Sequence, residues 1–108
     1  QFYLFASFDK CCAGTASTYR IMVGRADTIT GPYRDRNGTP MLEGGGSELL
    51  TSEGRIRGPG GQEILVRDGE PWLVYHWYDR DQNGMPKLAL TPIEFDDEGW
   101  PVVTLPQL

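Results

Sequence analysis

The fold is decided by the stretch Trp72-Leu73-Val74-Tyr75-His76-Trp77-Tyr78-Asp79. A similar apolar run ending in Asp occurs earlier, at residues 2–9 (Phe-Tyr-Leu-Phe-Ala-Ser-Phe-Asp). Each copy is followed by a polar, glycine-containing loop and then by a second apolar run, at residues 18–26 and 87–95. Asp9 and Asp79 are 70 positions apart. A strand–loop–strand unit repeated at this spacing is typical of successive blades of a β-propeller or of layers in another repeat fold.

Composition supports an all-β class. The 108 residues are 39% hydrophobic, which is typical of one small globular domain. Fourteen Gly and eight Pro are spread between short aromatic and β-branched runs, so many turns are expected. No stretch carries a 3.6-residue apolar period long enough for a helix.

The strand-like runs can be grouped into two blades. The second unit contains four runs, at residues 62–67, 71–78, 87–95 and 100–103. The first unit contains three, at residues 2–8, 18–26 and 48–51. Four antiparallel strands make one propeller blade. We therefore predict a partial blade without its innermost strand at residues 1–56 and a complete four-stranded blade at residues 57–108. Gln1 begins a strand at once, so we expect a piece of a longer chain.

Charge narrows the choice of partners. Ten Lys and Arg against fifteen Asp and Glu give a net charge of −5. Nucleic-acid binding depends on clustered Lys and Arg, so a nucleic-acid partner is not expected. No run approaches the ~18 apolar residues needed to cross a membrane. An acidic surface rich in Trp and Tyr better fits sugar rings, which stack on aromatic faces, or a cation.

Cysteine usage is unusual, because the only two cysteines, Cys11 and Cys12, are adjacent. Two interpretations stay open: a vicinal disulfide, or two reduced thiols in a loop. Neither makes a metal site, because no further Cys and no nearby His would complete one.

His76 is the leading candidate for a functional residue. It shares one face of its strand with Val74 and Tyr78, while Leu73, Tyr75 and Trp77 take the other. A lone histidine in an aromatic strand is commonly a hydrogen-bonded core residue, but imidazole is also a frequent metal ligand. The spacing alone does not decide between these roles.

A weaker pattern follows directly after that strand. Asp79, Asp81 and Asn83 alternate before a glycine, as in a calcium-binding loop, but position 90 is Leu instead of the Glu that completes an EF-hand. An Asx-rich turn between two strands is the favoured interpretation.

Other motifs predict no chemistry. Residues 58–61 (Gly-Pro-Gly-Gly) lack the Lys-Ser/Thr of a phosphate loop, so we interpret them as a backbone turn that permits close approach. Glu43 and Glu63 are acids without a second carboxylate at a known spacing, and Ser7 and Ser17 lack a nucleophile elbow.

Nearly the whole chain carries motifs in one collinear order, at residues 2–9, 11–12, 17–25, 28–33, 44–46, 58–61, 73–79, 83–88 and 99–102. This string resembles the family 43 glycoside hydrolases, and most of all their endo-α-1,5-L-arabinanase branch. The resemblance implies a five-bladed β-propeller, of which the chain would form most of the fourth blade and all of the fifth. It also implies an inverting mechanism that uses two carboxylates.

The resemblance also implies where the catalytic, metal-binding and substrate-binding residues lie. The catalytic base Asp, a pKa-tuning Asp and the acid Glu of the family would all precede Gln1, so no catalytic residue is expected in this chain, which alone should be inactive. His76 matches the family histidine that approaches a metal, usually calcium, in the central channel, where water supplies most other ligands. Residues 8–14 would lie at the rim of the cleft, and no substrate-binding residue is assigned.

We therefore expect the C-terminal part of a secreted, extracellular endo-arabinanase that acts on arabinan or arabino-oligosaccharides together with its missing N-terminal blades. One alternative is a non-catalytic carbohydrate-binding β-module. Another is an exo-acting arabinofuranosidase or xylosidase of the same family.

Overall fold

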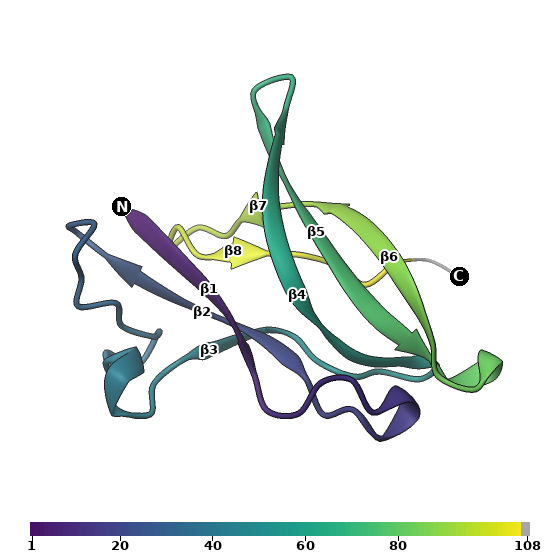
Figure 1. The fold of residues 1–108 in the computed structure, drawn as a ribbon. Helices are drawn as coiled ribbons and strands as arrows, with labels where there is room; N and C mark the ends of the chain where they lie inside the picture. The colour runs from purple at the N-terminus through teal and green to yellow at the C-terminus, as the bar shows by residue number, and fades with distance from the viewer. Residues whose placement is uncertain (107–108) are drawn as a thin grey trace.

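The computed structural model describes residues 1–106, which form antiparallel β-sheets joined by loops and short turns (Figure 1). This confirms the predicted all-β class. Within these residues, no helix has the length and apolar character that crossing a membrane requires. In the described part of the chain, three short 3-10 turns interrupt the loops: η1 (Gly14–Ala16), η2 (Met41–Glu43) and η3 (Arg80–Gln82).

The first sheet has the strand order β1-β2-β3, and its strands are β1 (Phe2–Phe8), β2 (Arg20–Ala26) and β3 (Ser47–Leu50). β1 and β2 pair without interruption from Phe2↔Ala26 to Phe8↔Arg20. All three predicted strands of the first unit are present, with ends shifted by at most two residues. Alternation along β1 directs Tyr3, Phe5 and Ser7 toward the protein, while Phe2 and Leu4 are exposed.

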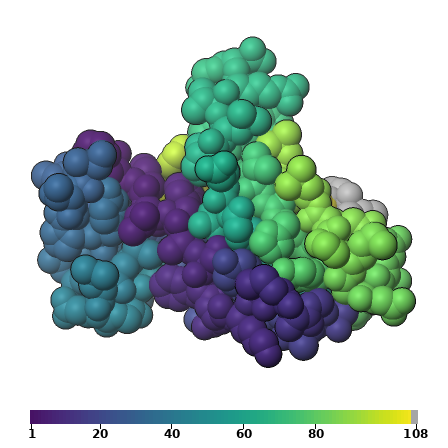
Figure 2. Space-filling model, viewed as in Figure 1, coloured from purple at the N-terminus to yellow at the C-terminus, as the bar shows by residue number. Residues whose placement is uncertain are grey.

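The second sheet has the order β4-β5-β6, and its strands are β4 (Ile56–Arg67), β5 (Glu70–Asp79) and β6 (Met85–Pro92). The β4–β5 hairpin turns at residues 68–69 and projects beyond the rest of the molecule (Figures 1 and 2). β5 and β6 pair in continuous register from Trp72↔Pro92 to Asp79↔Met85. The pairing of β4 with β5, in contrast, shifts register on both sides of Gly60.

The last predicted strand pairs differently from its neighbours. β8 (Pro101–Val102) pairs with the short β7 (Glu94–Phe95), in a two-stranded sheet of its own. The turn between them is organised by Asp96, whose carboxylate accepts hydrogen bonds from the Glu98 and Trp100 amides. The fourth run of the second unit therefore pairs with β7, which follows β6 directly after Ile93, instead of pairing with β6 itself.

The hydrophobic core lies between the two large sheets. Ile21 and Leu50 come from the first sheet. The second sheet and its flanks contribute the other members of the core: Ile56, Leu73, Tyr75, Trp77, Ala89 and Ile93. Because burial of apolar surface is the main force that holds sheets together, this shared core fixes one unit against the other.

Candidate functional site

His76 lies near the middle of β5, on the face opposite the hydrophobic core. Its strand neighbours Tyr75 and Trp77 point into the core and are 1% and 4% exposed. Because successive side chains alternate across a strand, His76 points to the other side. Its cross-strand partner on β4 is Gly60. His76 therefore does not occupy the core position that a lone histidine in an aromatic strand commonly takes.

Two aromatic rings and a glycine surround the imidazole of His76. The ring of Tyr78 meets it edge-on at 5.4 Å between centroids, and the tilted ring of Tyr19 lies 5.9 Å away. A Cβ atom built on Gly61 would lie 2.6 Å from Nδ1 of His76. The backbone of β4 therefore lies directly against one edge of the imidazole, and packing holds the ring in place.

The other ring nitrogen of His76 has no internal partner. Nε2 is buried and makes no hydrogen bond within residues 1–106. Burial lowers the pKa of His76 below its ordinary value of 6.5, which favours the neutral imidazole. A neutral imidazole carries a nitrogen lone pair, and this is the form in which histidine binds metals. Since buried polar atoms are almost always paired, Nε2 fits the role of a ligand atom.

His76 would be a solitary protein ligand within this part of the protein. Among the described residues, no group of three or more His, Cys, Asp or Glu side chains could hold a metal ion together. A metal at His76 would take its remaining ligands from water or from protein outside this chain. Oxygen-rich surroundings of that kind suit calcium.

Asp79, at the end of β5, serves the fold and not a metal. Its side chain is fully buried, and its carboxylate accepts hydrogen bonds from Nε and Nη2 of Arg55 at 3.0 and 2.6 Å. It also accepts from the amide of Asp81, which makes an Asx turn. The hydrogen bond to Arg55 is the main reason that the pKa of Asp79 is lowered. The turn interpretation of this segment is confirmed.

The Gly-Pro-Gly-Gly segment lies inside β4, so its interpretation as a turn is wrong. The expected close approach is confirmed. A Cβ atom on Gly58 would lie 2.6 Å from Cβ of Ser17, and one on Gly60 would collide with the ring of Tyr19. The register shifts around Gly60 absorb the extra residues as β-bulges, so that the strand continues where a turn was expected.

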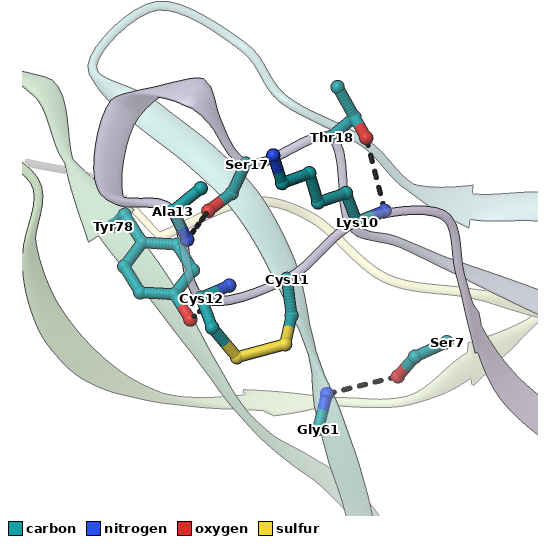
Figure 3. Close-up of a disulfide and its surroundings, with 9 residues drawn as sticks. All are labelled: Ser7, Lys10, Cys11, Cys12, Ala13, Ser17, Thr18, Gly61 and Tyr78. Atoms are coloured by element: carbon teal, nitrogen blue, oxygen red, sulfur yellow. Dashed lines mark hydrogen bonds between the residues drawn. A yellow bond between two sulfur atoms is a disulfide. The ribbon is translucent and has the colours of Figure 1, made fainter.

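Cys11 and Cys12 form a disulfide, which decides between the two interpretations left open by the sequence. Figure 3 shows the bridge beside Tyr78, whose hydroxyl accepts a hydrogen bond from the Cys12 amide at 3.0 Å. The Ala13 amide donates to Ser17 in the same loop. The disulfide loop is therefore tied to the tyrosine that packs edge-on against His76.

The remaining candidates have structural or exposed positions. Glu43 and Glu63 are exposed. The hydroxyl of Ser7 accepts a hydrogen bond from the Gly61 amide and donates one to Gln62, while Ser17 is buried.

Sequence reasoning assigned no role to Arg55, Gln62 or Tyr19. Their contacts join residues 24 to 57 positions apart, so no local pattern could have revealed them.

A family model described as Glycosyl hydrolases family 43 matches residues 1–101. The chain belongs to this family. Over 100 residues, which are 93% of the chain, it is 49% identical to a family relative, the extracellular endo-alpha-(1->5)-L-arabinanase 1 of Bacillus subtilis. Over 102 residues it is 42% identical to the extracellular exo-alpha-(1->5)-L-arabinofuranosidase ArbA of Cellvibrio japonicus.

Solved structures agree with this membership of family 43. The alpha-L-arabinanase of Cellvibrio cellulosa matches 94% of the chain with a TM-score of 0.91 and 42% identity. The endo-arabinanase of Bacillus licheniformis matches 93% with a TM-score of 0.86 and 46% identity. The chain spans only 30% of the Bacillus subtilis relative and 32% of the Cellvibrio structure.

Proposed function

We propose that this chain is part of a glycoside hydrolase that cleaves α-1,5-linked L-arabinan. The observation that carries the proposal is the 49% identity to an endo-arabinanase over 93% of the chain. A structure of the Cellvibrio relative in complex with arabinohexaose, which matches with a TM-score of 0.91, further supports an arabino-oligosaccharide substrate. The acidic, aromatic-rich composition suits a neutral sugar better than a polyanion.

The complete enzyme is a five-bladed β-propeller in this proposal. Residues 1–56 form most of one blade and the described residues from 57 onward form the last, while residues 107–108 of the expected range lie outside the part that the structure describes. Two consecutive antiparallel sheets that share a core support this arrangement. The rest of the protein supplies the other blades and covers the exposed apolar residues of the projecting β4–β5 hairpin, such as Ile64 and Val66.

The chemistry is inverting hydrolysis. One carboxylate of the complete enzyme activates water, and a second protonates the leaving oxygen. Both come from parts of the protein outside this chain, so the chain alone is inactive. Its own contribution is His76, whose unpartnered Nε2 binds a metal ion, proposed to be calcium. Such an ion would supply a fixed positive charge beside the active site.

The enzyme acts outside the cell in this proposal. Both the Bacillus subtilis and the Cellvibrio japonicus relatives carry the word extracellular in their names. A disulfide between Cys11 and Cys12 is consistent with an oxidising compartment.

An exo-acting arabinofuranosidase is the second candidate, and the 42% identity to the Cellvibrio japonicus exo-enzyme favours it. The two modes differ in whether one end of the cleft is closed. They release different products: an exo-enzyme releases one short product from chain ends, whereas an endo-enzyme releases a ladder of oligosaccharides.

The test is to express the full-length gene product and incubate it with linear α-1,5-arabinan. We expect a ladder of arabino-oligosaccharides and a rapid fall in polymer length. A single short product with slowly falling polymer length would favour the exo-enzyme. Binding of arabinan without any hydrolysis would contradict the enzyme proposal and favour a carbohydrate-binding module.

A further inference from the structure

We propose that Ser7 and Gln62 are positioning residues that orient the imidazole of His76 through the backbone of Gly61. Within residues 1–106, neither side chain hydrogen-bonds to the imidazole. They fix the bulge of β4 on which one edge of the ring rests. The inference rests on the metal role of His76 put forward above, and it adds the residues on which that role depends.

Among the described residues, packing, and not a hydrogen bond, holds the imidazole ring of His76 in place. In metal-binding histidines, the N–H of the second ring nitrogen usually donates a hydrogen bond to a carboxylate or a carbonyl, and this hydrogen bond fixes the ring orientation. Within residues 1–106, no side-chain hydrogen bond involves His76, and its Nδ1 edge faces the backbone of Gly61 instead. Packing against Gly61, Tyr19 and Tyr78 therefore replaces the usual hydrogen bond.

The position of Gly61 is fixed by a hydrogen bond to Ser7 on β1. Gly61 lies in the stretch of β4 where pairing with β5 is interrupted, between Gly60 and Glu63, and it has a left-handed φ of +62°. A bulge leaves backbone groups outside the ladder, so the strand alone does not fix their position. The Gly61 amide donates to the hydroxyl of Ser7 at 3.0 Å, as Figure 3 shows.

Gln62 connects the bulge of β4 back to β1 through two hydrogen bonds. The Ser7 hydroxyl donates to Oε1 of Gln62 at 2.7 Å, and Nε2 of Gln62 donates to the carbonyl of Phe5 at 3.1 Å. Ser7 and Phe5 lie on the same face of β1. The three hydrogen bonds form a closed path from β1 to the bulge and back. The uninterrupted strand of the first unit thus sets the position of the interrupted strand of the second.

Loss of the Ser7 hydroxyl leaves the Gly61 amide without its acceptor and frees the bulge to shift. The imidazole then loses its support on the Nδ1 edge, and Nε2 no longer points in one fixed direction. Because outer-shell partners of metal ligands typically contribute about 10–100-fold to metal affinity, we expect Ser7→Ala to weaken calcium binding by roughly 10-fold.

The test uses the full-length protein and compares Ser7→Ala with Ser52→Ala. Ser52 is a matched control, because its hydroxyl also accepts from a glycine amide of β4, that of Gly58, at 2.8 Å, but away from His76. Calcium affinity is measured by titration calorimetry after chelator treatment, and Tm is measured in chelator. We expect both variants to lower Tm and only Ser7→Ala to lower affinity. Ser7→Thr, which keeps the hydroxyl, should restore it.

A second readout separates this inference from the metal proposal. NMR spectra are recorded on chelator-treated protein that contains isotope-labelled histidine, and the imidazole signals of His76 are assigned by comparison with His76→Gln. These signals should shift in Ser7→Ala and stay in place in Ser52→Ala. If Ser7→Ala does not fold, Gln62→Met serves instead, because it removes the hydrogen bonds of Gln62 with Ser7 and with the Phe5 carbonyl. Unchanged His76 signals in a folded variant would overturn the positioning role. Shifted signals in a protein that binds no calcium would support positioning and contradict the metal.

Discussion

The two repeated units place the same residue in opposite environments. Asp9 follows directly after β1, and Asp79 is the last residue of β5, the strand that matches β1 in the repeat. The side chain of Asp9 is 47% exposed and pairs with Arg20 at 2.7 Å on the surface. Asp79 is fully buried, paired with Arg55 at 2.6 Å and 3.9 Å from Lys87. An exposed ion pair contributes only about 0–1 kcal/mol to the free energy of unfolding, whereas a buried carboxylate destabilises the fold unless an opposite charge pairs with it.

The two units also differ in how regularly their strands pair. β1 pairs with β2 without a break, but β4 pairs with β5 through two register shifts beside His76. The first unit has one register shift, between Ile21 and Met22 where β2 pairs with β3, whereas the second unit has two shifts beside His76, the buried ion pair and the unpartnered histidine nitrogen. Irregularity concentrated at one place in a repeat is typical of a functional site.

Removing the two aspartates separately is the strongest way to break this comparison. In the full-length protein, we expect Asp79→Ala to lower Tm strongly, because it removes the main carboxylate partner of Arg55, leaves only the 3.7 Å contact with Asp81, and deprives the Asp81 amide of its acceptor. Asp9→Ala should lower the free energy of unfolding by less than about 1 kcal/mol. Thermal melts followed by circular dichroism measure both effects. Equal melts for the two variants would show that burial does not distinguish the units.

Glycine substitutions test the bulge beside His76. Gly61 and Gly69 have left-handed φ angles of +62° and +79°. A side chain at such a φ costs about 1 kcal/mol. Only Gly61→Ala also pushes a methyl group against His76, since nothing lies within 4 Å of a Cβ on Gly69.

We therefore expect Gly61→Ala to lower the free energy of unfolding by about 1–3 kcal/mol more than Gly69→Ala does, which is the usual cost of overpacking. Urea denaturation of the full-length protein provides the comparison, with Gly69→Ala as the control for backbone strain. Similar losses in both would mean that His76 moves aside freely.

Acid unfolding sharpens the contrast between the two ion pairs. The pKa of Asp79 in the folded protein is below the ordinary 3.8, chiefly because of its hydrogen bond to Arg55. A lowered carboxylate pKa stabilises the fold above about pH 3.8, and this stabilisation is lost as the pH falls through the folded pKa. Arg55→Gln raises that pKa, so we expect acid unfolding to begin at higher pH.

Arg20→Gln is the matched control for this change, since it removes the surface partner of Asp9 and leaves Asp79 untouched. Fluorescence of the tryptophans, recorded between pH 2 and 7, reports both midpoints. An upward shift of the same size in both variants would contradict a special role for the buried pair.

Replacing both cysteines should have the smallest effect. Cys11 and Cys12 are adjacent, so the bridge closes the shortest possible loop and removes little freedom from the unfolded chain. The loop is also held by hydrogen bonds from the Lys10 and Ala13 amides to Thr18 and Ser17. We expect Cys11→Ser combined with Cys12→Ser to lower stability by about 1 kcal/mol or less, measured by thermal melts.

The sequence predicts most strands of this fold because alternation and turn residues are local properties. The strands at residues 2–8 and 71–78 and the turn at Asp68-Gly69 are examples. The beginning of β4 was missed, because its glycines are typical of a turn, whereas in the structure the segment pairs with β5 and lies against Tyr19 and His76. Such contacts cross between distant segments and leave no periodic pattern.

The candidate site, like the fold, could be predicted from the sequence only in part. His76 was singled out from its strand position and from family resemblance, but nothing local indicates that its Nε2 lacks a partner. The burial of Asp79 was equally hidden, because Asp9 occupies the same place in the repeat and is exposed. Burial depends on how the two sheets meet.

The most direct test of this account is to count the metal bound by the full-length protein and by its His76→Ala variant. Both are purified, dialysed against trace calcium and analysed for metal content, with circular dichroism to confirm folding. We predict one calcium ion per wild-type molecule and strongly reduced occupancy in the folded variant. Equal metal content in the two proteins would contradict it.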